Sequence, residues 1–325
     1  SKVQGEFNKK GIKELYSQLM SMSRKLQYQR LVESGALGRL PFIQIDSLDK
    51  ENARVVFQGT EGAYGQAAMH QFFGDDVNCF HVRTFRDAME AIEEGSADYA
   101  VLPIENSSAG PVNEMYDLLD EFENYIVAET ILPVVHTLSG LPGTKLSEIK
   151  RVYSKAEALM QTTRFLDDHS DWQRISVVNT AIAAKKVLED QDKAQAAVCS
   201  TYAAKLHGLE VLVDEINDEE DNSTRFIVVT NQKIFLKDAS KISIEFELPH
   251  ESGSLYNILS HFIYNDLNMT KIESRPVEGK QWEYRFFVDF DGNLEDAAVK
   301  NAIRGLREEA RNLRILGNYS IDGQI

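Results

Sequence analysis

The sequence predicts an α/β protein with two lobes, followed by a smaller βαββαβ domain and preceded by a separate helix. Three observations predict this class. Short apolar runs alternate with segments of helical period from residue 54 to about 204, which indicates parallel sheets with sites at their strand ends. An acidic loop then leads into one more strand, so the chain is expected to return to its first lobe. The last part, residues 241–325, has the strand and helix order of ferredoxin-like folds.

Composition and charge narrow the class of protein. Of the 325 residues, 43% are hydrophobic, enough to build the cores of two or three domains. No apolar run reaches membrane-spanning length, and residues 1–30 lack a signal-peptide pattern. Cys79 and Cys199 lack metal-ligand spacing and fit a reduced, cytoplasmic compartment. A net charge of −16 argues against nucleic acid, and it means that local donors must capture any anionic substrate.

The N-terminal region is expected to form one helix and a linker. A helix over residues 12–30 carries an apolar stripe, formed by Ile12, Leu15, Tyr16, Leu19, Met22 and Leu26. Ser23 and Gln27 lie one turn apart on it. Residues 31–53, which contain Gly35, Gly38 and Pro41, are interpreted as a linker.

The first lobe is predicted to open with a strand at 54–57 and a helix at 66–73. Glycines at 59, 62 and 65 lie between them and would let the backbone come close to a ligand. They do not match the G-x-G-x-x-G pattern, so a nucleotide site is rejected. A strand at 77–82 and a helix from Thr84, its cap, to Gly95 follow.

The stretch 99–112 joins a buried strand to a polar loop and a helix. Pairing is expected to stop at Pro103, which has no amide hydrogen. Pro111 is expected to begin the helix, with Gly110 before it. The loop carries a carboxylate, an amide and two hydroxyls, which belong to Glu105, Asn106, Ser107 and Ser108. These groups could seat an anion at the helix start or could only cap the helix, and both interpretations stay open.

The second lobe is expected over about 133–204. Its strands are predicted at 152–154, 175–178 and 196–199, and its helices at 156–166, 180–188 and 201–207. The first lobe would comprise 54–132 and 205–232. Two lobes crossed by a double connection make a cleft that can close by hinge motion, as in periplasmic binding proteins.

Three separated motifs resemble one enzyme family. Residues 103–112, P-I-E-N-S-S-A-G-P-V, resemble the P-I-E-N-S-x-x-G-x-V motif of prephenate dehydratases, and residues 222–226, N-S-T-R-F, resemble the N-x-T-R-F of that family. Residues 273–276, E-S-R-P, resemble a motif of the ACT regulatory domain attached to these enzymes. The resemblance covers roughly residues 54–325 and implies a lyase that converts prephenate to phenylpyruvate in L-phenylalanine biosynthesis, without a cofactor or metal.

The resemblance also implies roles for single residues. Thr224 would be catalytic, as a donor to the leaving hydroxyl; a neutral threonine is a very weak acid, so hydrogen bonding is preferred to full proton transfer. Glu105 could supply a proton if burial raises its pKa, and Arg225 could bind substrate or pair with the acidic loop 214–221. The expected substrate-binding residues are Glu105, Asn106, Ser107, Ser108, Ser154, Gln161, Arg225, Phe226 and Thr60.

Two positions depart from the pattern of the family. Gly65 stands where a hydroxyl residue is usual, and Lys155-Ala156-Glu157 stands where the family has His-Pro-Gln. These departures leave a non-catalytic amino-acid sensor as one alternative. Arogenate dehydratase is another, because the two substrates differ only in the side chain.

In the last domain, Gly253-Ser254-Leu255 resembles the G-A-L ligand loop of ACT domains. The resemblance implies that L-phenylalanine binds between paired ACT domains of a homodimer or homotetramer and regulates the enzyme. The implied effector residues are Gly253, Ser254, Leu255, Asn268, Glu273, Ser274, Arg275 and Pro276.

The N-terminal helix resembles the last helix of helical-type chorismate mutases, in which a Ser and a Gln at the spacing of Ser23 and Gln27 face the active site. The two helices that supply cationic residues in that enzyme are not in these 325 residues. We therefore prefer a packing or dimerising helix, and keep part of a bifunctional chorismate mutase/prephenate dehydratase as an alternative. No nucleic acid or membrane partner is expected.

Overall fold

The computed structural model describes residues 5–33, 40–219, 221–248, 250–277, 279–280 and 282–321. The chain divides into two compact units. The two-lobed unit is Leu48–Gln232 with Ile321–Ile325, and the ferredoxin-like unit is Lys233–Ser320 with Ser1–Ser47. Within the described residues, no helix combines the length and the apolar character needed to cross a bilayer.

Lobe 1 of the two-lobed unit is a mixed sheet with strand order β6-β12-β4-β2-β3. Strand β2 runs parallel to β3 and β4, and β12 runs antiparallel to β4 and β6. The predicted cap of the second helix is confirmed, because Thr84 and Asp87 form a capping box. The elements are β2 (Arg54–Gln58), α2 (Tyr64–Phe73), β3 (Asn78–Val82), α3 (Phe85–Glu93), β4 (Tyr99–Asn106), β5 (Gly110–Pro111), α4 (Asn113–Glu121), β6 (Tyr125–Pro133) and β12 (Ser223–Thr230).

Strand β4 continues past Pro103, so the prediction that pairing stops there is wrong. Glu105 pairs with Arg225 and Pro103 with Phe226, which makes Ile104 the extra residue of a β-bulge that tolerates the missing amide hydrogen. Pro111 does not begin a helix either, since β5 returns as a short hairpin against the end of β4 and α4 begins at Asn113. The polar loop is therefore a hairpin turn and not a helix start.

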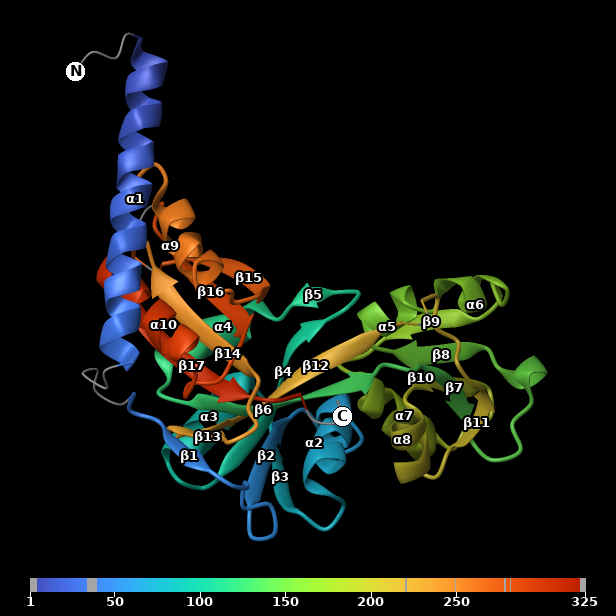
Figure 1. The fold of residues 1–325 in the computed structure, drawn as a ribbon. Helices are drawn as coiled ribbons and strands as arrows, with labels where there is room; N and C mark the ends of the chain where they lie inside the picture. Colours follow the sequence, from blue (N-terminus) through green and yellow to red (C-terminus); the bar gives the residue numbers. More distant parts are fainter. Residues whose placement is uncertain are drawn as a thin grey trace. The chain divides into compact units, whose positions relative to one another are not determined.

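Lobe 2 has the strand order β11-β7-β10-β8-β9, with β8 parallel to both β9 and β10. Figure 1 shows α5 and α6 on one face of this sheet and α7 and α8 on the other. The predicted strands are confirmed, but the helix expected at 156–166 is two short helices. The elements are β7 (Thr137–Gly140), η1 (Leu146–Glu148), β8 (Arg151–Ser154), α5 (Ala156–Met160), α6 (Thr163–Asp167), β9 (Gln173–Ser176), α7 (Thr180–Asp190), β10 (Gln195–Cys199), α8 (Thr201–Leu206) and β11 (Glu210–Val213).

Two crossing segments join the lobes, residues 134–136 and 214–219. They are bonded to each other: the Ile216 amide donates to the His136 carbonyl at 2.9 Å, and the His136 amide donates to Asn217 Oδ1 at 2.6 Å. Because β11 pairs with β7, lobe 2 extends to Val213, beyond the expected boundary near 205. The predicted return of the chain to lobe 1 is confirmed by β12.

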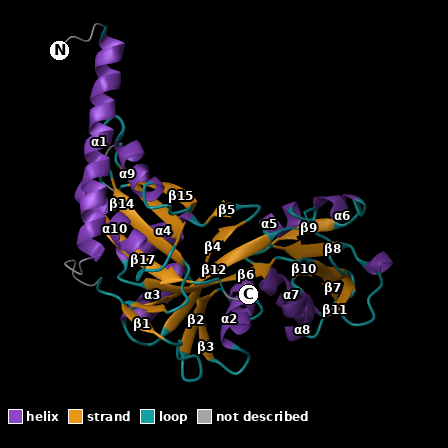
Figure 2. Cartoon of the chain, viewed as in Figure 1, coloured by secondary structure: helices purple, strands orange, loops and turns teal. Residues whose placement is uncertain are grey.

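The ferredoxin-like unit has the predicted βαββαβ order and a sheet ordered β15-β16-β14-β17 (Figure 2). Its core joins the sheet to two helices through Phe246, Phe262 and Phe290, which are fully buried. The elements are β14 (Lys241–Glu247), α9 (Ser254–Ile263), β15 (Met269–Pro276), β16 (Tyr284–Asp291), α10 (Ala297–Glu309) and β17 (Arg311–Tyr319).

Helix α1 (Glu6–Glu33) belongs to the same unit and is longer than the predicted 12–30. It lies along α10, and Gln18 Nε2 donates to the Tyr256 hydroxyl at 2.9 Å. Part of the stretch interpreted as a linker is a strand, β1 (Ile43–Ile45), which pairs in parallel with β13 (Ile234–Leu236).

Candidate functional site

Thr224 and Asn106 meet at the paired ends of β12 and β4. They are register partners, and Asn106 Nδ2 donates to Thr224 Oγ1 at 2.9 Å. Both residues are half-buried. Since the threonine oxygen accepts from Asn106, its own proton must be donated elsewhere, and among the described residues it has no acceptor. The Thr224 hydroxyl is therefore held in position and has a proton that it can donate to a ligand.

The Asn106 amide is fully engaged inside the protein. Nδ2 also donates to Asn222 Oδ1 at 2.9 Å and to the Ser223 carbonyl at 3.1 Å. Its Oδ1 accepts from the backbone amides of Ser108 and Ala109 at 3.0 and 2.9 Å. Asn106 was expected to bind the substrate, but its polar atoms are engaged within the protein, where they position Thr224 and shape the hairpin turn.

The two serines of the loop contact the connection that returns from lobe 2. Ser107 Oγ donates to the Asp221 carbonyl at 3.1 Å and accepts from the Ser223 amide at 2.9 Å. Ser108 Oγ donates to Glu219 Oε2 at 3.0 Å. A cavity of about 290 Å³ opens here between the lobes, lined by Ser108, Ala109, Glu157, Met160, Gln161, Asn217, Asp218, Glu219 and Asn222.

Gln161 reaches this interlobe cavity from lobe 2, as the resemblance implied. Its Oε1 lies 3.0 Å from His136 Nε2, and His136 Nδ1 lies 3.2 Å from the Tyr64 hydroxyl. Burial lowers the pKa of His136, while the bond to Gln161 opposes this shift. Because Gln161 Oε1 can only accept, His136 Nε2 carries the proton in this arrangement, and the Tyr64 hydroxyl shares its one proton between His136 Nδ1 and the Val135 carbonyl at 2.9 Å. The Gln161 NH2 group is then left as a donor for the cavity.

Sequence reasoning missed His136, Tyr64 and Asn217. Tyr64 begins α2, whereas His136 and Asn217 lie on the two segments that cross between the lobes, so three separate parts of the chain meet here and no local pattern in the sequence marks the cluster. His136 is 2% exposed, so it acts on Gln161 from inside the protein.

Two expected ligand contacts are buried. Ser154 is fully buried, and its hydroxyl donates to the Val198 carbonyl on the neighbouring strand at 2.6 Å. Phe226 is 2% exposed and belongs to the lobe 1 core. Neither side chain reaches the interlobe cavity, so both predictions are corrected.

Arg225 forms ion pairs on both flanking strands. Nη2 lies 3.1 Å from Glu105 Oε2 on β4, and Nη1 lies 3.7 Å from Glu129 Oε2 on β6. These two carboxylates, on β4 and β6, lie outside the acidic loop that the sequence had suggested as one possible partner. The Glu105 carboxyl, which had been considered as a proton donor, thus lies beside a guanidinium.

The loop over residues 59–65, which contains three glycines, approaches lobe 2. Thr60 Oγ1 lies 3.4 Å from Asn179 Nδ2, at the start of α7. Gly62 has a φ of +85°, and a Cβ added there would lie 3.4 Å from Ala181 Cβ. The glycines therefore permit close contact between lobes, where a ligand contact was expected. At Gly65 an added Cβ would lie 3.1 Å from the Gln58 carbonyl, so a larger residue would be crowded.

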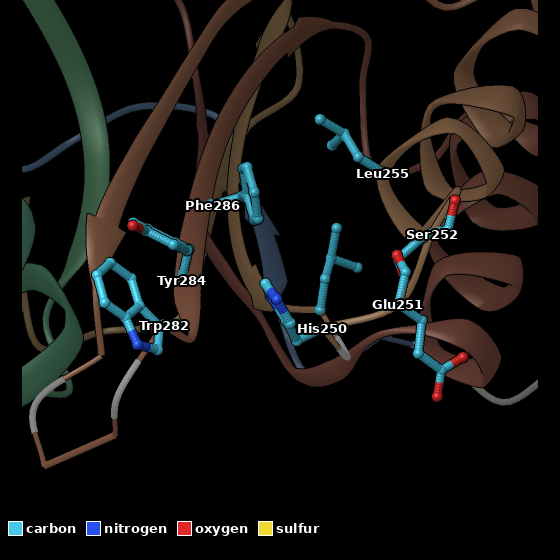
Figure 3. Close-up of a pocket in the computed structure, with 9 residues that line it drawn as sticks. His250, Glu251, Ser252, Leu255, Trp282, Tyr284 and Phe286 are labelled. Carbon is cyan, nitrogen blue, oxygen red and sulfur yellow. The ribbon is translucent and has the colours of Figure 1, made fainter.

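The ferredoxin-like unit has its own cavity, of about 360 Å³ (Figure 3). Ser254 and Leu255 of the predicted effector loop line it, and Gly253 precedes them with a φ of +91°. Figure 3 shows Trp282, Tyr284 and Phe286 on one side, with Ser252 and Leu255 on the other. The remaining lining residues are Leu248, His250 and Glu251.

The other predicted effector residues lie on β15. Ser274 pairs with Phe286 and Pro276 with Tyr284, so Glu273, Ser274, Arg275 and Pro276 lie on the strand next to the aromatic wall. Asn268 precedes the opposite end of β15, where its Nδ2 donates to Asp291 Oδ2 at 2.8 Å. One chain therefore does not bring Asn268 to this cavity. The sequence analysis did not single out Trp282, Tyr284 or His250.

In the part of the chain that the structure describes, no group of three His, Cys, Asp or Glu residues could hold a metal ion. Ser23 and Gln27 are both exposed on α1.

Together, the fold and site define a two-lobed α/β protein with a poised hydroxyl beside an interlobe cavity, joined to a ferredoxin-like unit with an aromatic cavity. A family model described as prephenate dehydratase matches residues 55–234. The chain belongs to the prephenate dehydratase family.

Proteins named prephenate dehydratase or arogenate dehydratase are similar in sequence to this chain. The bifunctional chorismate mutase/prephenate dehydratase of Escherichia coli strain K12 is 32% identical over 299 residues, which cover 90% of this chain and 78% of that protein. Arogenate dehydratase/prephenate dehydratase 2 of Arabidopsis thaliana, a chloroplastic protein, is 34% identical over 324 residues, covering 96% and 81%.

Solved structures agree on the fold. A prephenate dehydratase of Arthrobacter aurescens in complex with L-Phe has a TM-score of 0.76 and 33% identity, and covers 82% of this chain and 89% of that one. A protein described as GqqA, a quorum quenching acylase, has a TM-score of 0.77 and 30% identity, covering 83% and 98%.

Proposed function

We propose that this protein is a prephenate dehydratase, which converts prephenate to phenylpyruvate in L-phenylalanine biosynthesis. The observation that carries the proposal is the Thr224 hydroxyl, whose oxygen accepts from Asn106 so that its proton is available to a ligand. Family membership and the interlobe cavity beside this pair support it.

The reaction suits these groups. In prephenate the bond between the ring and its carboxylate breaks and releases CO2, its electrons enter the ring, and the ring hydroxyl departs as hydroxide, which takes a proton from solvent to become water. Because the product is aromatic, the substrate supplies the driving force. The protein has to hold the dianion and stabilise the departing hydroxyl. Thr224 would donate a hydrogen bond to that oxygen, and Gln161 would donate to a carboxylate.

We further propose that the ferredoxin-like unit is an ACT domain that binds L-phenylalanine and reduces activity. Its cavity combines an aromatic wall with a polar rim, which suits an aromatic amino acid. The Arthrobacter relative was solved with L-Phe. Since Asn268 and the loop 253–255 are apart in one chain, a complete effector site that uses both requires a second copy, as a homodimer or homotetramer.

The test is incubation of the purified chain with prephenate, arogenate and chorismate in separate reactions. We expect one CO2 per phenylpyruvate from prephenate, no loss of chorismate, and a lower rate when L-phenylalanine is added. The alternative, a non-catalytic sensor, predicts amino-acid binding without turnover of any of the three, and that outcome would overturn the proposal.

A further inference from the structure

A charged pair stands at the rim of the interlobe cavity. Lys155 precedes α5, and its side chain makes no capping bond. Its Nζ lies 2.5 Å from Glu157 Oε2, and Glu157 lines the cavity. The two side chains are 47% and 63% exposed.

The other carboxylates of the cavity wall are bound to neighbouring groups. Asp218 accepts from the Thr163 and Arg164 amides, both at 2.9 Å, and so caps α6. Glu219 accepts from Ser108. Among the described residues that line the cavity there are three carboxylates and no Lys or Arg. Positive charge comes from its rim, where Arg164 Nη1 donates to the Asp218 carbonyl at 3.1 Å and the Lys155 ammonium is held by Glu157. An anionic ligand entering here would meet that ammonium.

The Lys155–Glu157 pair can be opened at little cost. An exposed ion pair of this kind contributes about 1 kcal/mol or less to stability, because water screens it and two long side chains must be ordered. A ligand that offers its own charges can therefore replace either partner. The Lys155 side chain makes no capping hydrogen bond to α5, so opening the pair does not break a helix cap.

We propose that Lys155 and Glu157 recognise the side chain of the substrate and set the choice between prephenate and arogenate. This inference rests on the proposed function. Both substrates carry a side-chain carboxylate, which Lys155 would bind. They differ at the next carbon, where prephenate has a keto oxygen and arogenate an ammonium group. The Glu157 carboxylate attracts the ammonium and is unfavourable next to the keto oxygen, so it favours arogenate relative to prephenate.

Two substitutions separate these roles, with kcat and KM measured on both substrates. For Glu157→Gln we expect the ratio of kcat/KM for prephenate over arogenate to rise about tenfold, the worth of one charge-assisted hydrogen bond. For Lys155→Met we expect KM to rise about five- to tenfold for both substrates with kcat unchanged. Lys185→Met and Glu189→Gln are matched controls, because they disrupt an exposed Lys–Glu pair on α7 that lies away from the interlobe cavity.

The outcomes are distinct. A substrate ratio within twofold of the parent protein in Glu157→Gln, or an unchanged KM in Lys155→Met, would overturn this inference while the parent still turns over substrate. Equal effects in the Lys185 and Glu189 controls would do the same, since they would show a general charge effect. If the parent chain turns over neither substrate, the proposed function itself fails.

Discussion

Replacing Thr224 with valine tests the catalytic proposal most directly. The change removes the hydroxyl and keeps the branched shape that suits a strand. Losing one preorganised donor to a departing oxygen costs about 10²- to 10³-fold in kcat, or about 2.7–4 kcal/mol of transition-state stabilisation. The fold should be little affected, because the two Asn106 Nδ2 hydrogens keep Asn222 Oδ1 and the Ser223 carbonyl as acceptors.

The assay measures phenylpyruvate formation from prephenate, together with the midpoint of urea unfolding. Thr224→Ser is the matched control; it keeps the hydroxyl and should retain activity within about tenfold. Asn106→Ala should lower both kcat and stability, since it frees Thr224 and also removes the acceptor of two loop amides. A folded Thr224→Val enzyme with kcat within threefold of the parent would refute the role of the hydroxyl.

Three further predictions concern stability and effector binding. Arg225→Met should lower the free energy of unfolding by about 3–5 kcal/mol in urea titration, because it removes the guanidinium that faces Glu105 and the Glu129 side chain, which is 1% exposed; no loss would show that the pair is dispensable. Burial raises the pKa of Glu245 from 4.5 to about 7, so the folded state holds a proton that the unfolded state has lost. The free energy of unfolding should therefore fall by about 3 kcal/mol as pH rises through that range. Glu245→Gln should remove this part of the pH dependence, and an unchanged pH dependence would contradict the assignment. In the Trp172→Phe variant, Trp282 is the sole tryptophan, and it is 73% exposed. L-phenylalanine, but not L-alanine, should shift the fluorescence emission of Trp282 to the blue and protect it from quenching by iodide. Unchanged emission would argue against the cavity as the effector site.

The order of elements could be predicted because it depends on local signals. Alternating apolar runs located most strands, and Thr84 marked a helix start that a capping box confirms. Pro103 was misjudged because its effect depends on the register with a strand far along the chain, where a bulge at Ile104 absorbs it. The sequence around a residue indicates its conformational preference, whereas its pairing partners in the sheet determine whether the fold can accommodate that preference.

The candidate site was predicted only in part for a related reason. A motif indicates which positions matter, but it does not say whether the side chain faces a ligand or the core. Gln161 lines the interlobe cavity and Thr224 is linked to its wall through Asn106 and Asn222, whereas Ser154 and Phe226 are core residues of the same motifs. His136 was missed because its role exists only where two crossing segments meet.

The position of Asn222 links catalysis to the movement of the lobes. Its carbonyl accepts from the Val134 amide at 2.8 Å, so it ties the returning connection to the outgoing one. Its side chain accepts from Asn106, which in turn holds Thr224. A hinge motion that separates the two crossing segments must therefore change the position of the Thr224 hydroxyl as well as the width of the cavity. Under the proposed function, closure would then align the Thr224 donor and exclude water in one step.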